Sequence, residues 1–181
     1  MTASKTPAPA APQRIHSLNI AVLTVSDTRT IEQDTSGALL IEMLRADGHR
    51  LADRALIKDD RFQIRAVVSH WIAEPGVDVI LTTGGTGFTG RDSTPEAITP
   101  LLEKIIDGFG ELFRQVSFEE IGTSTIQSRA LGGLSNGTLV FCMPGSRNAC
   151  QTAWMRILHN QLDVNFKPCN FVELIPRFNE R

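Results

Sequence analysis

Short apolar runs alternate with stretches of helical periodicity along most of this chain. Residues 18–25 are almost wholly apolar, as expected for a strand that is buried on both faces of a sheet. Residues 51–57 and 77–81 are expected to form two more strands. Between the strands, residues 34–37 carry helix-start chemistry, and apolar residues repeat at helical spacing over 64–72. This alternation predicts an α/β fold, with a mostly parallel sheet covered by helices on both faces.

The pattern beyond the third strand is less regular. Residues 93–96 form a capping-box pattern, and apolar residues at helical spacing continue from there to 106, although Pro100 is expected to bend or restart the helix. Gly108 and Gly110 are expected to break this stretch, so that a separate helix covers 111–120.

A hairpin and a last helix complete the expected elements. The Asn136-Gly137 pair favours a type I′ turn between strands over 131–134 and 138–143. An amphipathic helix follows over 147–158, with Trp154 on its apolar side. Ligands of such folds bind beyond the carboxyl ends of the strands, so the loops at those ends are the expected location of a site.

Length and composition indicate one domain without a membrane span or a nucleic-acid-binding surface. The 181 residues carry a net charge of −2, whereas proteins that coat nucleic acid or anionic membrane need a basic surplus. No apolar run approaches the ~18 residues of a membrane span, and the N-terminus lacks the apolar stretch of a signal peptide.

Residues 1–16, rich in Ala and Pro, are expected to be a disordered tail before a single domain over 17–181. Three cysteines without metal-ligand spacing favour reduced thiols and a cytoplasmic location.

Three segments with candidate chemistry fall at expected strand ends, over 26–28, 82–92 and 144–146. A parallel sheet brings such ends together along one edge. The glycines of the second segment lack a Cβ, so the backbone there can turn with positive φ and point several N–H groups at one anion. A tight turn without a ligand is the simpler alternative, but the density of Gly and Thr favours a phosphate-bearing ligand.

Two familiar nucleotide-binding patterns match this segment only in part. Gly85-x-Gly87-x-x-Gly90 satisfies the dinucleotide fingerprint, but it follows the third strand, and no acidic residue ends a strand about 20 residues later. The same stretch begins like a Walker A loop, but Arg91-Asp92 replaces the Lys-Ser/Thr pair that binds phosphate and metal. Both a nicotinamide-dependent enzyme and a P-loop ATPase are therefore disfavoured.

Asp92 lies inside the expected anion loop, where a negative charge would repel phosphate. An aspartate at this place is consistent with a divalent cation that bridges the carboxylate and the phosphate oxygens. Asp59, at the end of the second expected strand, is a candidate for a second oxygen ligand. The alternatives are an acid favoured by a helix N-terminus for Asp92 and a solvated loop acid for Asp59.

Taken together, these segments resemble the molybdopterin-binding MoaB/MogA family. The resemblance rests on residues 82–87, 91–96 and 143–146, and on the segments 117–129 and 168–171, which look most like the B branch of that family. It covers the chain from about residue 18 to residue 171.

The resemblance implies a three-layer α/β/α domain that assembles as trimers or hexamers and binds molybdopterin, a phosphate-bearing pterin dithiolene. In the catalytic branch of the family, the phosphate of molybdopterin attacks the α-phosphorus of ATP in the presence of Mg²⁺. The products are adenylylated molybdopterin and pyrophosphate. Such a reaction needs positioning and charge neutralisation rather than a covalent nucleophile, and no tightly bound redox cofactor is expected.

The resemblance also assigns roles to individual residues. Asp59 and Asp92 match the two functional carboxylates of the family, which we interpret as catalytic residues that position Mg²⁺ and the nucleotide phosphates. Residues that match ligand-binding positions, or adjoin them, are Ser26, Asp27, Thr83, Gly84, Gly85, Thr86, Gly87, Ser128, Pro144, Gly145, Ser146 and Arg147.

One position departs from the family pattern. Many relatives have a lysine three residues after the glycine of the Pro-Gly loop, where this chain has Asn148. Arg147 is a candidate for the missing positive charge, although arginine and lysine present different geometry. Two hypotheses therefore remain, a molybdopterin adenylyltransferase and a protein that binds or carries molybdopterin without turnover.

Overall fold

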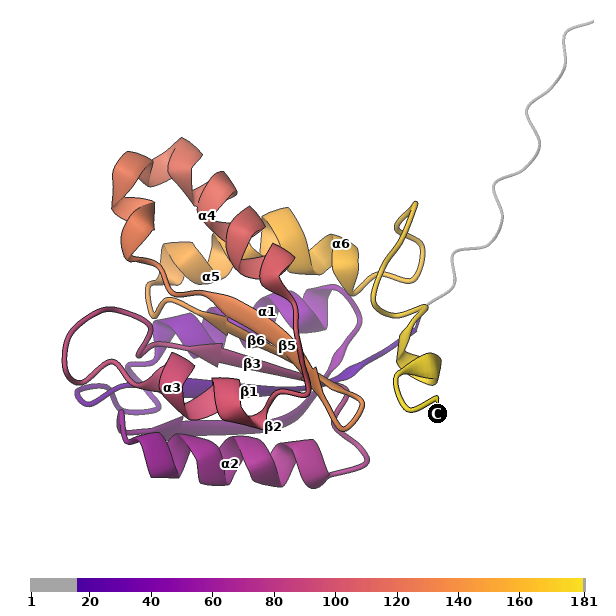
Figure 1. Ribbon diagram of the computed structural model, residues 1–181, viewed down its shortest axis with the longest axis horizontal. Helices are drawn as coiled ribbons and strands as arrows, with labels where there is room; N and C mark the ends of the chain where they lie inside the picture. The colour runs from indigo at the N-terminus through magenta and orange to yellow at the C-terminus, as the bar shows by residue number, and fades with distance from the viewer. Residues whose placement is uncertain (1–15, 181) are drawn as a thin grey trace, which may run out of the picture.

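Six strands form one sheet in the order β2-β1-β3-β6-β5-β4 in the computed structural model, which describes residues 16–180 (Figure 1). Strands β2, β1, β3 and β6 run parallel, whereas β5 pairs antiparallel with both β6 and β4. The mostly parallel sheet confirms the predicted fold class. The strands are β1 (Asn19–Val25), β2 (Arg50–Ile57), β3 (Val79–Thr83), β4 (Lys104–Ile105), β5 (Leu131–Ser135) and β6 (Thr138–Met143).

Helices cover both faces of this sheet and make three layers. Helices α2 and α3 lie on one face, and α1, α4 and α5 lie on the other (Figure 1). The α-helices are α1 (Thr35–Ala46), α2 (Arg61–Ala73), α3 (Thr94–Ile98), α4 (Asp107–Ile121), α5 (Arg147–Ala153) and α6 (His159–Gln161). A π-helical segment, Trp154–Leu158, joins α5 to α6, and 3₁₀ helices cover Thr99–Leu101, Gly122–Gln127 and Ile175–Arg177.

The central strand β1 divides the core into two halves. Its side chains alternate between the faces, because successive residues of a strand point in opposite directions. Ile20 and Val22 belong to the half beneath α1, α4 and α5, and Ala21, Leu23 and Val25 belong to the half beneath α2. Each half contains one of the two tryptophans in a buried position.

The hairpin between β5 and β6 is confirmed. Asn136 and Gly137 both have positive φ, 48° and 81°, as a type I′ turn requires.

The helix expected from residue 93 ends at Ile98, so the interruption expected at Pro100 is present, but the predicted helical continuation to Ile106 is wrong. Pro100 disfavours further helix because it lacks an N–H group and crowds the preceding turn, and the chain continues as a short 3₁₀ helix. The apolar positions that follow then form the edge strand β4 instead. The N–H groups of Glu103 and Ile106, on either side of β4, donate to carbonyl oxygens of β5 at 2.9 Å and 2.8 Å.

The expected break at Gly108 and Gly110 is also wrong, because α4 begins at Asp107 and includes both glycines. The two positions differ in their surroundings. A Cβ added at Gly110 would lie 2.5 Å from the carbonyl oxygen of Ala130, whereas one added at Gly108 would meet nothing within 4 Å. Gly110 therefore allows α4 to pack closely on the chain before β5.

The sheet order brings the predicted site segments together. Strands β1, β3 and β6 are direct neighbours, so the loops after Val25, Thr83 and Met143 leave the same edge. The chain moves outward from β1 to β2 and then returns to the other side of β1 as β3, which makes a topological switch point.

Two sequence predictions concern the chain termini and membranes. Most of the tail predicted over 1–16 lies outside the described residues. Within residues 16–180, no helix combines the length and the apolar character needed to cross a membrane.

We predict opposite effects for alanine at the two glycines of α4. Gly110→Ala should lower the free energy of unfolding by roughly 1–3 kcal/mol, because the methyl group overlaps a backbone carbonyl. Gly108→Ala should leave it unchanged or raise it by up to about 1 kcal/mol, since alanine favours the helix. Urea unfolding of both variants measures the difference, and equal stabilities would contradict the close approach.

Candidate functional site

A cavity of about 550 Å³ opens at the edge where the strand ends meet. It is lined by most of the predicted site residues, namely Ser26, Thr83, Gly84, Gly85, Thr86, Gly87, Asp92, Ser128, Pro144, Gly145 and Ser146. Thr28, from the candidate segment 26–28, also lines it, and residues that the sequence did not single out as site residues complete the lining, namely Thr24, Val25, Arg29, Ile121, Ser124 and Gln127. Asp27, Asp59 and Arg147 lie outside the lining.

The turn after β3 has a backbone that only glycine adopts without strain. Gly84 and Gly85 have φ values of 102° and 65°. The N–H of Gly84 donates to the carbonyl oxygen of Met143 at 3.1 Å, and the hydroxyl of Thr94 donates to the carbonyl oxygen of Gly84 at 2.9 Å. No described residue accepts a hydrogen bond from the N–H of Gly85 or Thr86. These two amides are therefore available to a ligand.

Asp59 is held against the start of α3. Its Oδ1 accepts hydrogen bonds from the backbone N–H and the hydroxyl of Ser93, at 3.1 Å and 2.6 Å. Partial burial raises the pKa of Asp59, as do the negative charges of Asp92 and Asp27, against the lowering effect of the Ser93 hydrogen bonds. The predicted capping box is not formed, because Ser93 binds Asp59 and makes no side-chain cap bond, while Glu96 pairs with Arg129.

Asp92 has the opposite electrostatic character. Its Oδ2 accepts hydrogen bonds from the hydroxyl and the N–H of Thr89, at 2.6 Å and 2.8 Å. These bonds, the hydroxyl's foremost, lower the pKa of Asp92. The ionised form is thus stabilised at Asp92 and disfavoured at Asp59.

The two carboxylates suit a Mg²⁺ ion that shares its ligands with a substrate. Magnesium is commonly held by one or two carboxylates together with substrate phosphates and water, rather than by a cage of protein side chains. Within the described residues, no group of three or more His, Cys, Asp or Glu side chains is arranged to hold a metal. A cation between Asp59 and Asp92 would also relieve the repulsion that raises the pKa of Asp59.

Arg129 fixes the loop that carries Asp92. Its Nε donates to the carbonyl oxygen of Thr86 at 3.2 Å, and its Nη2 donates to that of Asp92 at 2.9 Å. The guanidinium also pairs with Glu96 and lies 5.2 Å from the ring centre of Phe88. Sequence reasoning missed Arg129, although it lies in a segment that resembles the family, because its contacts are all distant in sequence.

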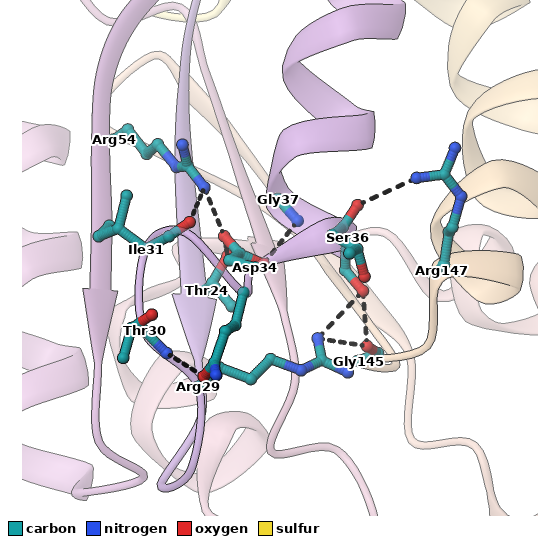
Figure 2. Close-up of polar contacts among 12 residues, drawn as sticks. Thr24, Arg29, Thr30, Ile31, Asp34, Ser36, Gly37, Arg54, Gly145 and Arg147 are labelled. Atoms are coloured by element: carbon teal, nitrogen blue, oxygen red, sulfur yellow. Dashed lines mark hydrogen bonds and ion pairs between the residues drawn. The ribbon is translucent and has the colours of Figure 1, made fainter.

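The positive charge of the cavity does not come from the predicted position. Arg147 donates through Nη1 to the carbonyl oxygen of Thr35 at 3.5 Å, and Asn148 donates through Nδ2 to Glu120 at 2.7 Å. Arg29, in the loop between β1 and α1, lines the cavity instead. Figure 2 shows its side chain extended toward Gly145. A basic residue three positions after Ser26 was the signal in the sequence that could have indicated it.

A glycine turn with open amides beside two carboxylates, at the switch point of an α/β sheet, suits the class of proteins that bind a phosphate-bearing ligand. Residues 21–164 match the sequence model of a family described as a probable molybdopterin binding domain. The chain belongs to this family, and within it to the molybdenum cofactor biosynthesis protein B group.

Known relatives agree in sequence and in structure. The chain is 55% identical over 152 residues to molybdenum cofactor biosynthesis protein B of Escherichia coli strain K12, covering 84% of this chain and 89% of the relative. The Bacillus cereus protein of the same name is 46% identical, over 78% of this chain and 84% of the relative. A crystal structure of molybdenum cofactor biosynthesis protein B superposes with a TM-score of 0.80 at 44% identity, covering 83% of this chain and 94% of that chain. The tungsten cofactor synthesizing protein MoaB from Pyrococcus furiosus gives 0.72 at 37% identity, covering 80% and 92%.

The pKa shifts predict opposite effects on stability for Asp59→Asn and Asp92→Asn. The pKa of Asp59 is raised on folding, so its ionised form destabilises the protein above that pKa and has no effect below the ordinary value of 3.8. Asp59→Asn should therefore raise the melting temperature at neutral pH, and the gain should vanish in acid. The pKa of Asp92 is lowered, so Asp92→Asn should lower the melting temperature at neutral pH, and this loss should disappear as pH falls through the lowered pKa.

Calorimetric melting from neutral to acidic pH measures both effects. The two variants remove one charge each from neighbouring positions, so they act as controls for each other. Shifts of the same sign at neutral pH would contradict the assigned electrostatics.

Proposed function

We propose that this protein is a Mg²⁺-dependent molybdopterin adenylyltransferase. The observation that carries the proposal is a glycine turn with free amides that is adjoined by both Asp59 and Asp92. In the proposed reaction, a phosphate oxygen of molybdopterin forms a bond to the α-phosphorus of ATP. The bond from that phosphorus to the bridging oxygen of the β-phosphate breaks, and pyrophosphate leaves with that electron pair.

The residues of the chain would act by binding and orientation. The amides of Gly85 and Thr86 would donate to phosphate oxygens, and hydroxyl groups around the cavity, such as those of Ser26 and Ser128, would bind other polar atoms of the ligand. Asp59 and Asp92 would hold Mg²⁺ on the nucleotide phosphates, and the bound ion would neutralise charge that develops on the leaving pyrophosphate. Phosphoryl-type transfer depends chiefly on such positioning and neutralisation.

The proposal needs molybdopterin, ATP and Mg²⁺, without a tightly bound redox cofactor. We further propose that the protein acts in the cytoplasm. Its three cysteines, Cys142, Cys150 and Cys169, are free thiols, as is usual in a reducing compartment.

The second candidate function is binding or transport of molybdopterin without turnover. Asn148 favours it, because this residue carries no charge and its amide group is engaged with Glu120. Many relatives have a lysine at this position, so the Pro-Gly loop of this chain lacks that positive charge.

We predict that the purified protein converts molybdopterin and ATP to adenylylated molybdopterin and pyrophosphate when Mg²⁺ is present. Asp92→Asn should abolish turnover but leave molybdopterin affinity within about threefold, because the loop amides are retained. Asp60→Asn is the matched control, since Asp60 caps α2 outside the cavity lining and asparagine also caps helices. Product is measured by chromatography and affinity by pterin fluorescence.

Each outcome of that experiment separates the two candidates. Tight binding without product would favour the carrier function. Turnover of Asp92→Asn at the wild-type rate would contradict the proposed role of the carboxylate.

We also propose that the protein assembles as a homo-oligomer, a trimer or a hexamer, through the region around α4. Among the described residues, half of the ten exposed large apolar side chains lie on α4, on the 3₁₀ helix after it and on the adjoining π-helical segment. They are Leu112, Phe118, Ile121, Ile126 and Met155. The 3₁₀ helix also supplies Ser124 and Gln127 to the cavity, so a second copy would adjoin the site.

Charged substitutions in this region should disrupt the assembly. Ile126, 77% exposed, changed to Glu should reduce the molar mass measured by light scattering after size exclusion. Phe62→Glu is the control, because Phe62 is 72% exposed and lies on α2, on the other side of the sheet. A monomeric wild-type protein would exclude the assembly, and equal effects of both variants would exclude this surface.

A further inference from the structure

Arg29 is the one cationic side chain among the residues that line the cavity. The other arginines near the site have different partners. Arg129 binds the loop backbone and Glu96, and Arg147 binds the backbone of α1. The cavity therefore draws its positive charge from the loop between β1 and α1.

The position of Arg29 is determined by neutral partners. Its Nη1 donates to the hydroxyl of Ser36 at 3.2 Å and to the carbonyl oxygen of Gly145 at 3.3 Å (Figure 2). The Ser36 hydroxyl in turn donates to the same carbonyl oxygen at 2.8 Å, and Ser36 is fully buried. The backbone N–H of Arg29 donates to the hydroxyl of Ser26 at 3.2 Å. These contacts orient the guanidinium without neutralising it.

The nearest buried carboxylate already has a different cation. Asp34 accepts hydrogen bonds from the N–H of Gly37 at 2.9 Å and from the hydroxyl of Thr24 at 2.7 Å. Its Oδ2 also forms an ion pair with Nη2 of Arg54 at 3.0 Å, on the side away from Gly145 (Figure 2). Across the part of the chain that the structure describes, Arg29 forms no ion pair, and its Nε and Nη2 make no hydrogen bond to protein.

We infer that Arg29 binds the anionic phosphate group of the pterin ligand, a role that rests on the proposed function. A guanidinium presents several donors to phosphate oxygens, and such charge-assisted hydrogen bonds are stronger than neutral ones. The phosphate would lie between Arg29 and the free amides of the glycine turn. Arg29 thereby offsets the repulsion that Asp59 and Asp92 exert on a phosphate in the same site.

The inference accounts for the absence of lysine at 148. Asn148 lies on α5 and is engaged with Glu120, so it contributes no charge to the ligand. Arg29 reaches the neighbouring Gly145 from the opposite loop, and its charge serves the same part of the cavity.

The test compares molybdopterin with its dephosphorylated form in fluorescence titrations of the full-length protein. Arg29→Ala should weaken molybdopterin binding by about 10- to 100-fold, and leave binding of the phosphate-free pterin within about threefold. Arg29→Lys should recover part of the loss, because lysine keeps the charge but not the fork of donors. Arg45→Ala is the control, since Arg45 is an exposed residue of α1 outside the cavity lining.

The outcomes distinguish this inference from the proposed function. Unchanged affinity in Arg29→Ala, or equal loss for both pterins, would overturn the phosphate role. If Arg29→Ala does not fold, the same comparison is made with Arg29→Lys. Equal affinity changes for the two pterins in that variant would also overturn the phosphate role. Inorganic phosphate is tested by calorimetry in parallel. Arg29-dependent binding of phosphate without any binding of molybdopterin would keep Arg29 as an anion-binding residue but exclude both the pterin ligand and the proposed function. Binding of neither ligand would exclude an anion-binding role for Arg29 as well.

Discussion

The site depends on how closely the backbone at Gly84 approaches the ends of the neighbouring strands. A Cβ at Gly84 would lie 2.1 Å from the carbonyl oxygen of Val25, and one at Gly145 would lie 3.1 Å from the Cα of Gly84. Any side chain at these places would push apart the ends of β1, β3 and β6. The next residue is equally restricted, because a Cβ at Gly85 would meet the Asp59 carboxylate at 2.4 Å. The same absence of side chains that closes the turn also leaves its amides open to a ligand.

Opposite charges lie at this edge of the sheet, in the cavity lining and directly beside it. Asp59 and Asp92 come from loops after β2 and β3, and Arg29 comes from the loop after β1. Hydrogen bonds from Thr89 favour the ionised form of Asp92, while burial and neighbouring acids disfavour it at Asp59. A cation bound between the two acids would favour the ionised form of Asp59. Nucleotide-bound Mg²⁺ and a phosphate held by Arg29 would therefore complement each other in charge. This division of charge supports the proposed two-substrate reaction.

Sequence patterns predicted the parts of the fold and site that depend on local chemistry. The buried strands, the Asn136-Gly137 turn and the glycine turn each follow from a few adjacent residues. The errors concern residues whose role depends on distant partners. The helical spacing over 98–106 did not indicate that the backbone beside β4 would pair with β5. The glycine at 110 likewise did not indicate how closely α4 approaches Ala130. Arg29 and Arg129 were missed for the same reason, because a long flexible side chain has many possible partners until the fold selects them.

The contact between Asn148 and Glu120 bears on the choice between enzyme and carrier. It joins α5 to α4, and Glu120 also accepts a hydrogen bond from the hydroxyl of Thr152 at 3.0 Å. Asparagine at 148 therefore contributes to helix packing, and the cavity next to it does not lose its positive charge, because Arg29 lines the same cavity. If phosphate binding relies on Arg29, substitution of the lysine does not in itself imply loss of catalysis. The decisive groups for turnover are then the carboxylates, and both Asp59 and Asp92 are present with their supporting hydrogen bonds. On these grounds the adenylyltransferase is the better supported of the two functions.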